Sequence, residues 1–304
     1  MKRDIQFNSQ GVNCAGWFYL PDETEDGSKY PAIVMAHGFS ATKEMCLSNF
    51  AERFVEAGFG VLVFDYRYMG ESEGKPRSQL FPHQQHQDYR NGISWIRQQP
   101  EIDPDWVGVW GSSYSGGHVL HLAATDRRIK AVVAQVPLVN GYANAQRLLR
   151  PDQLAAFQRD LAADREQRYT TGNINYAKVV APEGEPSVLP TPDSHEWFIS
   201  TSERLAPNWR NQVSLESLDY FLEYNPAANI QLISPTPLLM VVAENDHVTP
   251  TDLAITAYER ALEPKKLVII RGRHFDAYTG AGLEQSATPA VEWFKQHLKH
   301  GASV

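Results

Sequence analysis

The sequence predicts an α/β fold: a mostly parallel central sheet flanked by helices, with an inserted cap. Short apolar runs, each of a length suited to a buried strand, alternate with segments of helical periodicity. Alternation of this kind builds strand–helix–strand units, whose strands run parallel in a sheet covered on both faces. The chain has 304 residues, of which 42% are hydrophobic, and this is ample for a sizeable core.

The first predicted elements are two strands and one strand–helix–strand unit. Residues 5–20 form two strands around Gly11. Residues 31–36 form a short apolar strand of the buried type, and residues 61–64 form another. A helix is indicated between them, and it ends at Gly58. Its apolar face consists of Leu47, Phe50, Ala51, Phe54 and Val55.

The later elements continue this alternation. A second helix, with apolar residues at 89, 93 and 96, leads to the strand that contains residues 107–110. Further strands are predicted at 129–136, 238–242 and 267–270. Two more helices have apolar faces made of Leu253, Ala257, Tyr258 and Ala261, and of Val291, Phe294 and Leu298.

Residues 139–233 interrupt this alternation of strands and helices. We interpret them as a cap inserted between two parts of one core, residues 1–138 and residues 234–304. The cap is predicted to begin with a helical segment over 146–168. A proline-rich stretch follows, which suits extended or turn structure. Its prolines are Pro182, Pro186, Pro190 and Pro192.

Aromatic residues are frequent in this predicted cap. An insertion after the carboxyl end of a strand lies where open parallel sheets bind their ligands. We expect most of these side chains to form a small core of the cap, and a few to line an apolar pocket. They are Tyr142, Phe157, Tyr169, Tyr176, Trp197, Phe198, Trp209, Tyr220, Phe221 and Tyr224.

A run of small residues separates the strand at 107–110 from a helical pattern. A tight strand-to-helix turn requires small residues, because it strains the backbone and brings strand and helix close together. A serine on such a turn holds its hydroxyl clear of both elements, so we predict that Ser113 is a nucleophile. Ser115 is the rival, but helical spacing places it on the first helical turn, where a packing role fits better. The run reads Gly111-Ser112-Ser113-Tyr114-Ser115-Gly116-Gly117.

A serine nucleophile needs a base to accept its proton and a third group to orient that base. His274 directly follows the last predicted strand and therefore lies beyond a carboxyl end, so we predict that it is the base. The weaker candidates lie within the predicted helices or in a loop; they are His83, His86, His118 and His121.

The loop after the strand at 238–242 supplies the acid. Asp246 is the first choice and Glu244 the second, because the order Ser, Asp, His along the chain matches one known arrangement of such triads. His247, beside the acid, either contacts the substrate or faces solvent, and we favour solvent.

The anionic oxygen of a tetrahedral intermediate needs a pair of donors. We predict that the backbone N–H of Tyr114, directly after the nucleophile, is one donor. The backbone N–H of Phe39, in the loop that follows His37 and Gly38, is predicted to be the other.

Three further residues near these elements are assigned structural roles. Asp65 and Arg67 end a strand on the same edge of the predicted sheet. We expect an ion pair or hydrogen-bond network there that holds the loop before Gly70. Cys46 is expected to pack in the core and not to act as a second nucleophile.

Charge and composition exclude several classes of function. The formal net charge is −8 without a basic tract, which disfavours nucleic-acid and membrane partners and fits a small neutral or apolar molecule. We expect neither a signal peptide nor a membrane span. Only Cys14 and Cys46 occur, so a cytoplasmic location without disulfides is expected. No zinc-type spacing, phosphate-binding loop or dinucleotide fingerprint is found, so no cofactor or metal is predicted.

Together these residues resemble the α/β-hydrolase superfamily over nearly the whole chain. The resemblance is carried by residues 37–39 and 64–72, the Ser113 turn, the Asp246 loop and His274. Within the superfamily, the Gly-Ser-Ser-Tyr-Ser-Gly-Gly turn and the inserted cap are similar to the dienelactone-hydrolase-like and Xaa-Pro dipeptidyl-peptidase-like groups, which include polyketide transferases. Such a resemblance implies the fold far more strongly than the substrate.

The sequence leads to one preferred function and three alternatives. The preferred one is a serine hydrolase that cleaves an ester or thioester of a small, largely apolar acyl group through an acyl-enzyme on Ser113. An acyltransferase would use the same triad with an alcohol or amine in place of water. A peptidase is less favoured, because no site for a free peptide amine can be named. A non-catalytic ligand receptor is disfavoured by the complete triad, and a homodimer is compatible with the composition.

Overall fold

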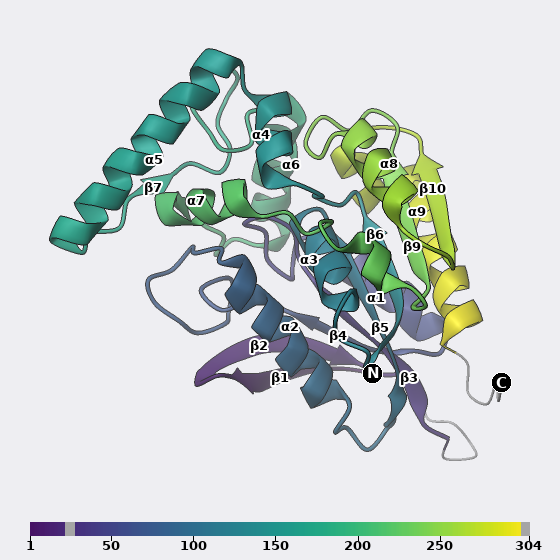
Figure 1. The fold of residues 1–304 in the computed structure, drawn as a ribbon. Helices are drawn as coiled ribbons and strands as arrows, with labels where there is room; N and C mark the ends of the chain where they lie inside the picture. Colours follow the sequence, from purple (N-terminus) through teal and green to yellow (C-terminus); the bar gives the residue numbers. More distant parts are fainter. Residues whose placement is uncertain (22–27, 299–304) are drawn as a thin grey trace.

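Eight strands form one central sheet in the computed structural model, which describes residues 1–21 and 28–298 (Figure 1). Across the sheet their order is β1-β2-β4-β3-β5-β6-β9-β10. The pairs β1–β2 and β2–β4 are antiparallel, and all other pairs are parallel, so the predicted fold class is confirmed. The strands are β1 Lys2–Ser9, β2 Val12–Tyr19, β3 Tyr30–Ala36, β4 Gly60–Phe64, β5 Ile102–Ser112, β6 Ile129–Gln135, β9 Leu238–Ala243 and β10 Lys265–Ile270.

Side chains of the central strands alternate between two apolar cores, one on each face of the sheet. Along β3, Val34 belongs to one core, whereas Ile33 and Met35 belong to the other. Every residue of β4 and of β9 is buried. The continuous apolar runs in the sequence therefore reflect strands that are covered on both faces.

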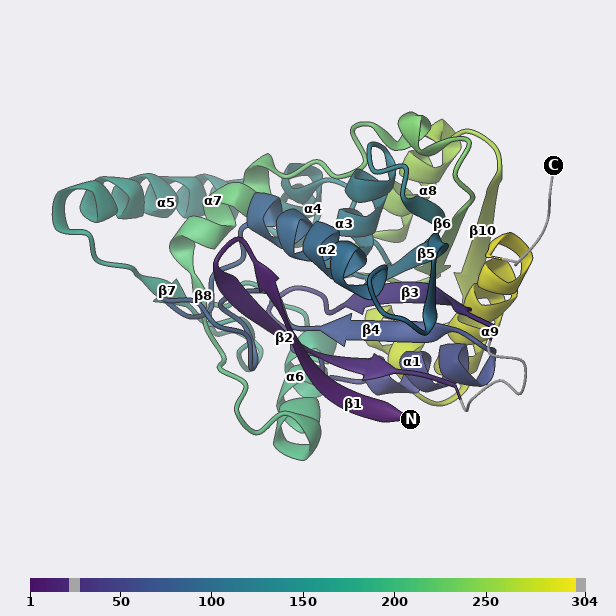
Figure 2. The ribbon, with the colours of Figure 1, turned by 90° about the horizontal axis from the view of Figure 1, so that it is seen from below.

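Helices form a layer on each face of the sheet (Figures 1 and 2). Residues of α2, α3 and α8 complete the core that contains Val34, and residues of α1 and α9 complete the core that contains Ile33. The apolar face predicted between residues 47 and 55 is buried in α1. The helices of these layers are α1 Leu47–Glu56, α2 Pro82–Ile96, α3 Tyr114–Ala123, α8 Thr251–Arg260 and α9 Gly280–His297.

Residues 139–233 form a helical layer beside the carboxyl ends of the parallel strands (Figure 1). One apolar cluster joins the two regions: Phe39 and Tyr114 of the sheet side pack with Leu161, Phe198 and Leu218 of the segment. The segment contains α4 Gly141–Leu148, α5 Pro151–Thr171, β7 Tyr176–Ala177, α6 Pro192–Leu205, β8 Val213–Ser214, α7 Leu215–Glu223 and the 3₁₀ helix η1 Ile230–Ile233.

The helical segment predicted over 146–168 is confirmed except at Leu149 and Arg150, where the helix is interrupted between α4 and α5. Arg150 is extended, with φ −64° and ψ 155°, since it precedes Pro151, which disfavours helical geometry in the residue before it. Pro151 then begins α5, where its missing N–H removes no intrahelical bond. Pro192 begins α6 in the same way, and neither α6 nor α7 was predicted.

The aromatic residues of this segment divide into two groups. Tyr142, Tyr169, Tyr176 and Tyr220 are exposed, which is compatible with the expectation that most, but not all, of these residues pack in a core. The six that pack in or against the apolar cluster are Phe157, Trp197, Phe198, Trp209, Phe221 and Tyr224. The 21-residue helix α5 is also largely polar.

Within residues 1–21 and 28–298, no helix combines the length and apolarity needed to cross a membrane.

Candidate active site

Ser113 lies on a strained turn between β5 and α3. Its φ of 59° and ψ of −118° are rare for a residue with a side chain. The turn leaves no room for larger neighbours: a Cβ on Gly111 would lie 2.2 Å from the Ser115 carbonyl oxygen, and one on Gly117 would lie 2.5 Å from that of Leu138. The small residues in the sequence are therefore required by the close approach of strand and helix, as predicted.

The two serines of the turn have different environments. Ser115 is fully buried, with its hydroxyl 2.9 Å from that of Tyr66 and 3.3 Å from that of Tyr89. Ser113 retains some exposure and lines a cavity that His274 also lines. The geometry therefore gives Ser115 the packing position and gives Ser113 access to a ligand.

Asp246 and His274 are brought together by the loops after β9 and β10. The Asp246 Oδ2 atom lies 2.7 Å from His274 Nδ1. The other oxygen, Oδ1, accepts hydrogen bonds from the N–H groups of Val248, at 2.9 Å, and Thr249, at 2.8 Å. Both side chains are buried. This arrangement fixes the carboxylate and favours a proton on Nδ1, which leaves the Nε2 lone pair of His274 free to accept one.

The alternative acid and bases are engaged elsewhere. Glu244 is exposed, and its Oε1 accepts a hydrogen bond from the Gly272 N–H at 3.3 Å. His118 is fully buried, with Nδ1 2.7 Å from the Tyr224 hydroxyl and Nε2 2.9 Å from Gln85 Oε1. The Tyr224 hydroxyl also lies 2.8 Å from Nε2 of His86.

The remaining candidates are similarly placed outside the Ser113 cavity. His121 stacks on His86 with ring centroids 4.1 Å apart. His83 and His247 are exposed, which agrees with the favoured interpretation of His247. None of these histidines shares the cavity with Ser113 and His274.

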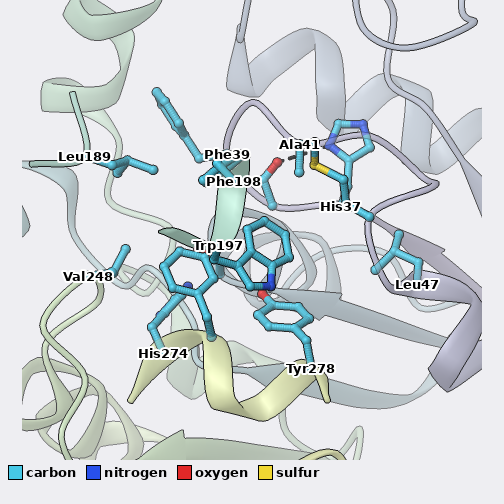
Figure 3. Close-up of a pocket in the computed structure, with 14 residues that line it drawn as sticks. His37, Phe39, Ala41, Leu47, Leu189, Trp197, Phe198, Val248, His274 and Tyr278 are labelled. Carbon is cyan, nitrogen blue, oxygen red and sulfur yellow. Dashed lines mark hydrogen bonds between the residues drawn. The ribbon is translucent and has the colours of Figure 1, made fainter. Parts of the chain in front are cut away.

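The two residues predicted to supply N–H donors both lie next to the nucleophile, Tyr114 in the chain and Phe39 in the cavity that Ser113 lines. Tyr114 is the first residue of α3, and the N–H groups of a first helical turn have no partner within the helix. The loop that carries Phe39 packs directly on Ser113, since a Cβ on Gly38 would lie 3.1 Å from the Ser113 Cβ and 3.6 Å from its Oγ. Phe39 and His274 line the same cavity (Figure 3).

A buried ion cluster supports the loop that contains Phe39, and the sequence did not reveal it. The side chain of Lys43 is 1% exposed, and its Nζ lies 3.1 Å from Asp65, 2.6 Å from Glu44 and 2.5 Å from Glu71. Its backbone N–H donates to Asp65 Oδ1 at 2.8 Å. Burial by itself would lower the pKa of Lys43, but the adjoining carboxylates outweigh it and raise that pKa.

The structural roles predicted for Asp65 and Arg67 are confirmed. The Glu71 N–H donates to Asp65 Oδ2 at 3.0 Å, and a Cβ on Gly70 would lie 2.1 Å from that oxygen, so the loop closes tightly around the carboxylate. Arg67 pairs with Asp88 at 2.7 Å, and both side chains are buried.

Cys46 is also buried, as predicted, and burial raises the pKa of its thiol, so it is a poor second nucleophile. In the part of the chain that is described, no three His, Cys, Asp or Glu side chains are grouped as a metal site requires.

Aromatic side chains surround the cavity at Ser113. Trp197 of α6 stacks on Phe275 at 4.7 Å between ring centroids, and Tyr278 lies on the same side as His274 (Figure 3). The Tyr278 hydroxyl lies 2.6 Å from that of Ser112. Trp197 is one of the ten aromatic residues of which a few were expected to line a pocket. Phe275 and Tyr278 were missed, although they follow His274 within four residues and this position is a usable signal.

The fold and this arrangement of side chains define an α/β hydrolase, an enzyme of the hydrolase or acyltransferase kind. The chain belongs to the X-Pro dipeptidyl-peptidase (S15) family, whose model matches residues 11–276. The resemblance stated from the sequence is thereby confirmed.

Proteins with related sequences have several names. The chain is 33% identical over 298 residues to the quorum-quenching protein AidA of Acinetobacter baumannii, covering 96% of this chain and 94% of that protein. It is 32% identical over 286 residues to the thiohydrolase aneE of Aspergillus aculeatus, covering 90% and 86%. It is 28% identical over 305 residues to the polyketide transferase grgF of a Penicillium species, covering 98% and 97%.

A solved structure matches the whole fold. The crystal structure of the α/β hydrolase GrgF from Penicillium sp. sh18 superposes with a TM-score of 0.83 at 27% identity, covering 98% of this chain and 99% of that one. The insertion between β6 and β9 is therefore included in the likeness.

Proposed function

We propose that the protein is a serine esterase or thioesterase in which Ser113, His274 and Asp246 form the catalytic triad. The observation that carries the proposal is the Asp246–His274 contact of 2.7 Å beside a cavity that Ser113 lines. His274 Nε2 takes the proton from Ser113 as its oxygen attacks the acyl carbonyl carbon, and later gives that proton to the leaving alcohol or thiol. Asp246 keeps the imidazole oriented and stabilises its cationic form.

In this mechanism, backbone N–H groups stabilise the tetrahedral intermediate. Tyr114 N–H, at the positive end of α3, and Phe39 N–H point to the place where negative charge develops on the carbonyl oxygen. When the leaving group departs, an acyl-enzyme on Ser113 remains. Water, deprotonated by His274, attacks it, and a second tetrahedral intermediate collapses to release the acid.

The chemistry of the cavity and the names of the relatives support an acyl substrate over a peptide. The described residues that line the cavity at Ser113 include no Asp or Glu, so none could pair with the free amine of a dipeptidyl-peptidase substrate. The aneE relative is named a thiohydrolase, which is the basis for including thioesters. Cys14 and Cys46 are both buried free thiols, which supports a cytoplasmic location.

Acyl transfer is the second candidate, and the likeness to the polyketide transferase grgF favours it. Both reactions share the acyl-enzyme and differ only in the nucleophile that attacks it. Product analysis at saturating concentrations of an alcohol or amine acceptor separates them: free acid alone argues for hydrolysis, and an acylated acceptor argues for transfer.

The test of the proposed nucleophile is labelling with a fluorophosphonate, followed by intact mass measurement and peptide mapping. Wild type is expected to gain one adduct, on Ser113. The Ser113→Ala variant should gain none, whereas the matched control Ser115→Ala should be labelled like wild type. Labelling of folded Ser113→Ala, or none of wild type, would refute the assignment.

A further inference from the structure

A second cavity lies beside the one at Ser113, within the helical segment 139–233. It measures about 540 Å³ and lies among α4, α5, α7 and residues 177–189. That volume is in the range of about 300–1,000 Å³ found for small-molecule sites. The cavity at Ser113 measures only about 30 Å³, which is too small for more than the reacting groups.

The two cavities share a wall made of side chains. Phe39 and Leu189 line both of them. The Phe39 ring lies edge-on to Phe221, at 5.9 Å between centroids, and Phe221 lines only the large cavity. The Phe39 and Leu189 side chains thus form a partition between the two cavities.

The lining of the large cavity matches an apolar chain. Leu148, Phe157, Leu161 and Leu218 contribute apolar side chains from three helices. The polar residues Gln153, Asp160 and Lys178 also line it but are exposed, so they mark the side open to water.

The position of His274 decides which part of a substrate the large cavity receives. His274 lines the small cavity but not the large one. Figure 3 places it with Tyr278, opposite Phe39 and Leu189. Because His274 must protonate the leaving atom, the leaving group lies on its side of the carbonyl. The acyl chain then extends in the opposite direction, towards the partition.

We propose that the large cavity binds the acyl chain of the substrate, and that Phe39 and Leu189 gate it. The inference rests on the proposed function and narrows it to extended, apolar acyl groups of medium to long chain length, not small ones. Burial of each methylene beyond the partition should raise kcat/KM about fourfold, the factor that corresponds to about 0.8 kcal/mol.

The first test is the kcat/KM profile for p-nitrophenyl esters from acetate to dodecanoate. Wild type should prefer the longer chains. Leu218→Trp, which fills the large cavity from α7, should lower kcat/KM for decanoate at least tenfold and leave acetate within twofold. The matched control is Leu262→Trp, at an exposed position outside both cavities, and it should keep the wild-type profile.

The outcomes separate this inference from the proposed function. A folded Leu218→Trp variant with the wild-type profile, or a wild type that prefers acetate, overturns the acyl site while leaving the triad in place. Absence of all ester hydrolysis together with absence of a fluorophosphonate adduct overturns both.

A second measurement does not depend on the folding of a variant. In a crystal structure of wild type labelled with a dodecylphosphonate, the alkyl chain should pass between Phe39 and Leu189 and end among α4, α5 and α7. A chain that does not enter the cavity among α4, α5 and α7 overturns the proposal.

Discussion

The carboxyl ends of the parallel strands and the helical segment 139–233 lie around the same cavities, but the strands are buried much more completely than the helices. Ser113, Asp246 and His274 follow β5, β9 and β10, and every residue of β9 is buried. In the 21-residue helix α5, by contrast, only Leu154, Leu161 and Asp164 are buried. The reacting groups therefore stand on a rigid support, whereas the residues around the large cavity belong to helices with few buried contacts, which open at lower free energy.

The largest effect on activity is expected from Asp246→Asn, in the loop after the fully buried strand β9. The amide cannot hold His274 in the required tautomer, so kcat should fall about 10⁴-fold with little change in KM. Steady-state hydrolysis of a short ester measures this. A loss of less than tenfold in a folded variant would show that another group orients His274.

Lys43→Met should have the next largest effect. It leaves the fully buried Asp65 without its cation, and removal of one partner of a buried pair costs about 3–5 kcal/mol of unfolding free energy. Denaturant unfolding measures this loss. We also expect a lower kcat, because Asp65 and Lys43 hold the loop that carries Phe39.

The matched control is Lys178→Met in the helical segment, where the lysine pairs with Glu185 at 3.1 Å and both side chains are exposed. An exposed pair is worth about 0–1 kcal/mol, so this variant should unfold almost like wild type. Equal losses for the two substitutions would contradict the contrast between the regions.

The unfolding free energy should depend on pH through His86 and His118, whose rings contact the hydroxyl of Tyr224 in the helical segment. Burial lowers the pKa of both histidines well below 6.5, and neighbouring histidines lower that of each further. An unfolded histidine titrates near 6.5, so the stability is complete above that pH and is lost as the pH falls towards the folded pKa. Each histidine should contribute a slope of about 1.4 kcal/mol per pH unit below 6.5.

Unfolding free energies between pH 5 and pH 7 test this expectation, with His118→Gln as the comparison. Below pH 6.5, the unfolding free energy of the variant should change less steeply with pH than that of wild type, by about 1.4 kcal/mol per pH unit, because glutamine does not titrate. An unchanged slope would mean that His118 is protonated in the folded protein, in conflict with its complete burial beside other histidines.

The smallest effect is expected from Arg168→Met, within the helical segment. Arg168 pairs with Asp164 at 2.7 Å, Asp219 at 3.0 Å and Glu216 at 3.1 Å, and so ties α5 to α7. Arg168, Asp219 and Glu216 are partly exposed, and the buried Asp164 keeps a hydrogen bond from Asn175 at 2.8 Å, so the loss of unfolding free energy should be about 1–2 kcal/mol, below that of Lys43→Met. A loss as large as that of Lys43→Met would show that the segment is as firmly held as the sheet.

Local patterns were sufficient to predict the sheet and to select the candidate triad. Buried strands appear as continuous apolar runs, and polar residues directly after such runs must gather at one edge of a parallel sheet, which is why Ser113, Asp246 and His274 could be chosen. The break before Pro151 was also accessible, since proline restricts the residue before it. Helices α6 and α7 were missed although their apolar periodicity is no weaker than that of α2 or α9. Pro192, the first residue of α6, was counted among the prolines of an extended stretch, whereas proline also begins helices.

The sequence by itself determined the order of strands and helices outside residues 139–233, the tight turn at Ser113 and the chemistry available at the edge of the sheet. These features depend on neighbouring residues, whose spacing sets the period and whose size limits the turn. Only the tertiary structure decided that Lys43 is buried among carboxylates and that Phe39 and Leu189 separate two cavities. Each of these depends on segments far apart in the chain, whose packing distances no local pattern records.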